Sequence, residues 1–119
     1  MDLVATIAVL IIAALHAYFL VLEMFLWTKP QGLKTFGMTP EQAKATAPLA
    51  ANQGLYNGFL AAGLLWGVLL GPAGFNVRVF FLLCVIVAGV FGAATAKRSI
   101  LFIQALPALI ALVLVWLAG

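Results

Sequence analysis

The stretch that decides the fold is residues 3–27, LVATIAVLIIAALHAYFLVLEMFLW, in which Glu23 is the one residue with a full charge at neutral pH. About 20 predominantly apolar residues in a helix are enough to cross the hydrocarbon core of a membrane. Three further stretches meet this requirement. We therefore predict an all-α integral membrane four-helix bundle forming a single domain over residues 1–119, with spans at Leu3 to Trp27, Gly54 to Leu70, Val77 to Ala96 and Ile100 to Ala118.

The overall composition excludes several classes of protein. Of the 119 residues, 66% are hydrophobic and 8% are charged, and the mean hydropathy is +1.24. Soluble domains are about 45–50% apolar and about 25% charged, and disordered chains are more polar still. The net charge of +3 is not gathered into a basic patch, so we expect no nucleic-acid partner. The expected surroundings are a lipid bilayer.

The basic residues predict the orientation, because loops rich in Lys and Arg stay in the cytoplasm. The side of the first and third loops carries five basic residues, and the opposite side carries Arg78, which can snorkel outward from its helix end. We expect a multi-pass protein of the inner (plasma) membrane with both termini outside. The first span exceeds the apolar core of a signal peptide, so we expect it to be retained. The five cytoplasmic residues are Lys29, Lys34, Lys44, Lys97 and Arg98.

The first loop contains a helix start at Thr39-Pro40-Glu41-Gln42, with Thr39 as N-cap and Gln42 completing a capping box. Pro48 has no amide hydrogen to donate, so we expect a short helix that ends before it. This helix has a weakly apolar side, which predicts an amphipathic helix on the membrane surface. The alternative is a plain connector.

Small residues recur four apart on the second and third spans, and this spacing lets membrane helices approach closely. We favour packing inside one bundle; the alternative is a face that forms homo-oligomers. In the fourth span, Pro107 removes one helical hydrogen bond and predicts a kink. The small-residue rows are Gly54/Gly58, Gly63/Gly67/Gly71, Ala88/Gly92/Ala96 and Gly89/Ala93.

Two ionisable residues stand inside the first span, where they are costly and mark function by default. His16 and Glu23 are seven residues apart, which places them on one face about 10 Å apart along the axis. This spacing does not match a zinc site, and the lone Cys84 excludes an intrachain disulfide. We therefore expect no metal and no cofactor, and we interpret Cys84 as an apolar filler.

Polar residues of all four spans fall in the cytoplasmic half, whereas the outer half is almost purely apolar. In hydrocarbon these groups must face one another or water. We infer a polar pocket open to the cytoplasm, with His16 at its floor and His16 and Glu23 as proton-sensitive groups. The other pocket residues are Asn52, Gln53, Tyr56, Asn57 and Gln104, and those of the rim are Trp27, Lys97 and Arg98.

Three functions remain open for this pocket. The first is binding or transport of a small, largely apolar molecule or lipid, with proton coupling through Glu23 and His16. The second is acid–base catalysis on a lipid-soluble substrate, with Asn57 or Gln104 polarising a carbonyl. The third is a structural or assembly subunit, in which these side chains only contact headgroups or join helices.

Three strings carry a resemblance over nearly the whole chain: HAYFLVLEMFLW at 16–27, AANQGLYNGFL at 50–60 and QALPA at 104–108. Together they resemble the small four-span membrane proteins grouped as domain of unknown function thirteen-oh-four. The resemblance implies a four-helix inner-membrane protein and carries no activity. Its motif residues coincide with the inferred pocket.

Overall fold

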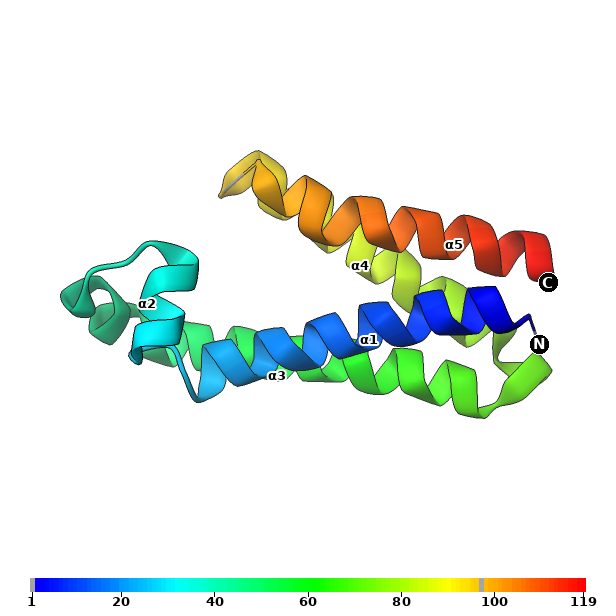
Figure 1. Cartoon of the computed structure of the whole chain (residues 1–119), viewed down its shortest axis with the longest axis horizontal. Helices are drawn as coiled ribbons and strands as arrows, with labels where there is room; N and C mark the ends of the chain where they lie inside the picture. The colour runs from blue at the N-terminus through cyan, green and yellow to red at the C-terminus, as the bar shows by residue number, and fades with distance from the viewer. Residues whose placement is uncertain (1, 97) are drawn as a thin grey trace. The chain divides into compact units, whose positions relative to one another are not determined.

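The computed structural model describes residues 2–96 and 98–119, and in this part of the chain the regular secondary structure is helical (Figure 1). It divides into two compact units. The terminal unit comprises the chain up to residue 13 together with residues 62–119, and the central unit comprises residues 14–61. The helices in chain order are α1 (Leu3–Met24), α2 (Pro30–Phe36), α3 (Pro40–Leu69), η1 (Gly71–Gly74), α4 (Phe75–Thr95), η2 (Leu101–Ala105) and α5 (Leu106–Ala118).

Within the described residues, three helical segments are long and apolar enough to cross a membrane: Leu3–Met24, Gly71–Thr95 and Leu101–Ala118. They correspond to the first, third and fourth predicted spans. α3 is longer than any of them but is not in this set. The polar residues Asn52, Gln53 and Asn57 lie in its middle and lower its hydropathy.

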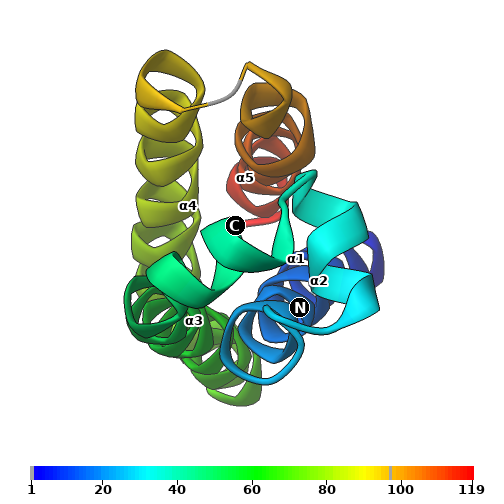
Figure 2. The same cartoon turned by 90° about the vertical axis from the view of Figure 1, so that its left-hand side faces the viewer.

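In the terminal unit, α4 packs side by side with α5 (Figure 2). It also contacts η2, the turn that directly precedes α5. Gly89 is buried at this contact, and a Cβ atom there would lie 2.7 Å from the backbone nitrogen of Ala105. The predicted close packing of small residues is confirmed at this position. η2 is a π-helical turn, closed by the Leu106 amide donating to the Leu101 carbonyl. The irregularity expected at Pro107 therefore lies in the turn just before it.

In the central unit, the second half of α1 lies against α3, and two glycines of α3 allow the contact (Figure 1). A Cβ atom at Gly54 would lie 2.7 Å from Cγ of Met24 and 3.1 Å from Cβ of Glu23. A Cβ atom at Gly58 would lie 2.6 Å from Cδ1 of Leu20. The row Gly54/Gly58 is thus the strip on which α1 rests.

The capping box predicted at the start of α3 is confirmed. The Gln42 amide donates to Oγ1 of Thr39 (3.2 Å), and the Thr39 amide donates to Oε1 of Gln42 (3.0 Å). The predicted end before Pro48 is wrong, because α3 runs through Pro48 to Leu69 as one helix of 30 residues. Pro48 is exposed, so the Lys44 carbonyl that loses its partner can bond to water instead.

The first loop also contains α2, which the sequence reasoning did not predict. Pro30 occupies its first turn, and Gly37 ends it with a left-handed φ of 61° while its amide donates to the Leu33 carbonyl. Pro at a helix start and Gly just past its end are ordinary boundary signals. A one-helix interpretation of the loop overlooked them.

Candidate intramembrane polar site

The centre of the candidate site is a buried side-chain pair that joins α1 to α3 within the central unit. The amide Nδ2 of Asn57 donates a hydrogen bond to Oε1 of Glu23. Glu23 is 5% exposed and Asn57 is 9% exposed. A carboxyl group and an amide placed this way satisfy each other away from water, and hydrogen bonds to a carboxylate are stronger than those between neutral groups.

His16 lies on the same helix as Glu23, two turns nearer its N-terminus, and is fully buried. Its ring meets that of Phe19 edge to face, with centroids 5.5 Å apart. Both ionisable residues singled out in the first span are therefore buried in the protein. Such burial within a membrane-spanning segment is expensive and usually has a functional reason.

The polar residues of α3 do not all share the surroundings of Asn57. Asn57 lies on the same face of α3 as Gly54 and Gly58, and this face packs against α1. Asn52 and Gln53 are exposed, and so is Tyr56, whose ring contacts Phe59 at 5.7 Å. The structure therefore brings Asn57 to Glu23 and leaves Asn52, Gln53 and Tyr56 on the surface of this chain.

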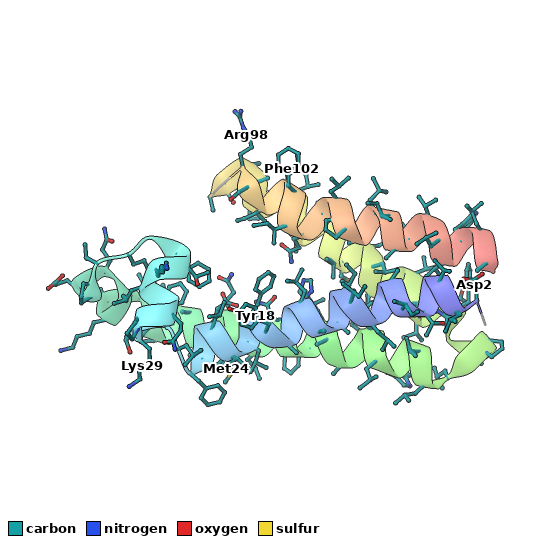
Figure 3. The ribbon with its side chains drawn as sticks, in the orientation of Figure 1. Asp2, Tyr18, Met24, Lys29, Arg98 and Phe102 are labelled. Carbon is teal, nitrogen blue, oxygen red and sulfur yellow. The ribbon has the colours of Figure 1, made fainter. Side chains whose placement is uncertain are left out.

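Of the residues assigned to the rim, Trp27 belongs to the central unit and Arg98 to the terminal unit. Trp27 is half-buried; its Nε1 donates to Oγ1 of Thr46 (3.1 Å), and its ring packs on Phe36 at 4.7 Å. Arg98 is exposed and points away from the helices of the terminal unit (Figure 3). The pocket residue Gln104 belongs to the same unit and is half-buried. The predicted rim residue Lys97 lies outside the described residues.

No group of three His, Cys, Asp or Glu side chains that could hold a metal ion occurs in the part of the chain that the structure describes. Cys84 is a half-buried free thiol on α4. The buried polar side chains of the central unit are one carboxyl, one imidazole and one primary amide, those of Glu23, His16 and Asn57.

Arg78, which the sequence allows to snorkel outward from its helix end, is buried and only 6% exposed. Nη1 donates to the carbonyls of Gly67 (2.9 Å) and Gly71 (2.8 Å) at the end of α3. The last carbonyls of a helix have no partner within it, and the Gly71-Pro72 turn that ends α3 stands close to Arg78 in sequence. This combination was the signal that could have identified the contact.

The chain matches the model of a family described as "Protein of unknown function (DUF1304)" over residues 10–116. It is also 26% identical over 115 residues to the "Uncharacterized protein YpaA" of Lactococcus lactis subsp. lactis (strain IL1403), covering 95% of this chain and 97% of that protein. No solved structure matches the chain. The match spans the helices that carry His16, Glu23 and Asn57, and the chain belongs to the DUF1304 family of proteins of unknown function.

Proposed function

We propose that this chain is a four-span protein of the inner membrane, with both termini outside, that binds a small, largely apolar molecule at His16, Glu23 and Asn57. In this proposal the C-terminal part of α3 is the second of the four spans, and the loop that carries α2 is cytoplasmic. Three helices long and apolar enough to span support the membrane assignment. The five basic residues on one side support the orientation.

The observation that carries the proposal is the burial of Glu23 against Asn57. An acidic residue on an apolar helix costs about 2.5–3.5 kcal/mol to insert into a membrane. An apolar side chain at position 23 would avoid this cost and pack equally well between helices. A carboxyl at this position, with a fully buried imidazole two turns away, favours a site whose polar groups select a ligand.

Proton coupling follows from the same two residues. A carboxyl and an imidazole are the groups that exchange protons in transporters, and intramembrane Glu and His residues form proton relays. A ligand that accepts a hydrogen bond from protonated Glu23 would leave when the proton leaves. This arrangement makes proton-coupled transport the proposed activity.

A structural role is the second candidate, and one observation favours it. Glu23 and Asn57 already satisfy each other, which is how an interhelical clasp would be arranged. The two functions differ in what the pair does with a third molecule. A clasp excludes ligands, whereas a binding site exchanges the Asn57 bond for one to the ligand.

Native mass spectrometry of the full-length protein, released from membranes in mild detergent, separates these functions. The proposal expects a co-purifying small molecule on the unaltered protein, reduced about tenfold or more by Glu23→Gln. Asn52→Ala, an exposed change on the same helix, is the matched control and should retain the molecule. Equal retention by Glu23→Gln, or no bound molecule on a folded unaltered protein, would contradict the proposal.

A further inference from the structure

The terminal unit contains a pocket of about 360 Å³, and none of the residues that line it belongs to the central unit. It is lined by the start of α1, by the turn between α3 and α4, and by the end of α5. Its size falls in the range of small-molecule sites, which is about 300–1,000 Å³. The first turn of α4 also contributes to the lining. The polar and apolar side chains that meet in the pocket are Asp2 and Thr6 at the start of α1, Pro72 in η1, Phe75 and Arg78 in α4, and Val115 in α5.

Arg78 is the positive group of this pocket, and it is held in place by the backbone. Its Nη1 donates to two carbonyls, Gly67 and Gly71, which uses both hydrogens of that nitrogen and fixes the plane of the guanidinium. Within the described residues, no hydrogen bond involves Nε or Nη2. These two nitrogens form the edge that binds a phosphate or carboxylate through two parallel hydrogen bonds.

Arg78 is only 6% exposed, yet it is one of the residues that line the pocket. No buried side-chain nitrogen or oxygen in the described part of the chain is left without a partner, so the remaining donors of Arg78 are accessible rather than sealed in. A preorganised, nearly buried guanidinium facing a cavity is a built anion site.

Asp2 supplies the opposite charge on the same pocket, at the start of α1 (Figure 3). Its Oδ1 accepts a hydrogen bond from the Ala5 amide (2.9 Å), which caps the helix and orients the carboxylate. Among the described residues, the hydrogen bonds of Asp2 and Arg78 do not join the two side chains. Each charge is therefore available to a ligand group of the opposite sign.

We propose that this pocket binds the headgroup of a phospholipid carrying both a phosphate and a primary ammonium, with the phosphate on Arg78 and the ammonium on Asp2. The pocket lies where the candidate spans Leu3–Met24 and Gly71–Thr95 begin and where Leu101–Ala118 ends, which is the level of lipid headgroups. Phe75 and Val115 line it and offer an apolar contact to the glycerol and upper acyl carbons.

The two charges predict which headgroups are rejected. A phosphatidylglycerol headgroup has no cation for Asp2, and its net negative charge is repelled there. A phosphatidylcholine headgroup has the cation but no N–H to donate to the carboxylate. Phosphatidylethanolamine alone among these three matches both residues.

The test is native mass spectrometry of the detergent-solubilised full-length protein, titrated in turn with phosphatidylethanolamine, phosphatidylglycerol and phosphatidylcholine. We expect phosphatidylethanolamine to bind about tenfold more tightly than the other two. Asp2→Asn keeps the helix cap, because Asn caps as well as Asp, but removes the charge. It should abolish the preference over phosphatidylglycerol. Glu41→Gln, an exposed acidic residue in the first turn of α3 that does not line the pocket, should leave the preference unchanged.

Arg78→Lys keeps the charge and loses the two-nitrogen edge, and it should weaken binding of phosphatidylethanolamine. Arg78 also bonds to the carbonyls at the end of α3, so Arg78→Lys could prevent folding. In that case the Asp2→Asn variant decides the test. Equal binding of the three lipids, or an unchanged preference in Asp2→Asn, would overturn the proposal. Tight binding of free phosphoethanolamine without retention of any lipid would overturn the assignment to a lipid.

Discussion

Asn57 on α3 donates its side-chain hydrogen bond to Glu23 on α1, so that a buried carboxyl and a buried amide connect two helices of the central unit. Gly54 and Gly58, on the same face of α3 as Asn57, make room for α1 at this level. The pair therefore depends on close helix packing, and the packing brings two costly polar groups to each other. Stability and ligand binding should both respond to changes here.

Replacing Asn57 by leucine removes the donor to Glu23 while roughly keeping the side-chain volume. We expect the free energy of unfolding to fall by about 1–3 kcal/mol, because the buried carboxyl loses its partner. Thermal unfolding in detergent, followed by circular dichroism, measures the change. Asn52→Leu, exposed on the same helix, should have little effect; equal losses in both variants would contradict the role of the pair.

Glu23→Leu combined with Asn57→Leu should cost less than the sum of the two single changes, because each single change removes the same hydrogen bond. A double-mutant cycle isolates the interaction, and polar pairs in membrane proteins give coupling energies of about 0.6–1.7 kcal/mol. Unfolding free energies of the four proteins give the value. A coupling energy of zero would mean that the two side chains do not interact in the folded protein.

Gly54→Ala should separate α1 from α3. The added Cβ would lie 2.7 Å from Met24 and 3.1 Å from Glu23, closer than side-chain atoms normally approach. Overpacking of this kind costs about 1–3 kcal/mol, and unfolding in detergent reports it. Gln53→Ala at the neighbouring exposed position is the control. A Gly54→Ala protein as stable as the unaltered one would show that the helices are not in close contact there.

Pro48→Ala should strengthen α3. An amide at position 48 can donate to the Lys44 carbonyl, and proline in a helix interior is about 3 kcal/mol less favourable than alanine. Slower amide hydrogen exchange across residues 44–52 is the expected result. Leu49→Ala, also exposed, controls for the loss of a side chain. Unchanged or faster exchange in Pro48→Ala would indicate that the helix is interrupted at this point.

The apolar stretches predicted most of the helices, because membrane-spanning helices depend on length and hydropathy, which sequence shows directly. The expected first span, Leu3 to Trp27, appears as α1, which ends at Met24. The Thr39 cap was equally visible, since a capping box is a local pattern. The continuation of α3 through Pro48 was not predictable by the same logic. A proline lowers helix stability without fixing a boundary, and an exposed position tolerates the lost hydrogen bond.

The candidate site was less accessible from sequence. Gln53, Tyr56 and Asn57 lie on one broad side of α3, but helical spacing does not tell which edge of that side meets another helix. The glycines at 54 and 58 carried this information, because they mark the strip that α1 covers, and Asn57 lies on that strip. Arg78 bonds to the backbone carbonyls of Gly67 and Gly71, so the signal for this contact in the sequence is the turn that ends α3 and not a partner side chain.

The most direct test of the proposed ligand site is whether a small apolar reagent reaches Glu23. Dicyclohexylcarbodiimide adds to protonated carboxyl groups in apolar surroundings, and peptide mass spectrometry locates the adduct. The account predicts modification of Glu23 in membranes at mildly acidic pH, and less of it as the pH rises. A water-soluble carbodiimide should label the exposed carboxyl groups of Asp2 and Glu41 instead. An unmodified Glu23, in a protein that the water-soluble reagent labels normally, would contradict a ligand site and leave a sealed structural clasp.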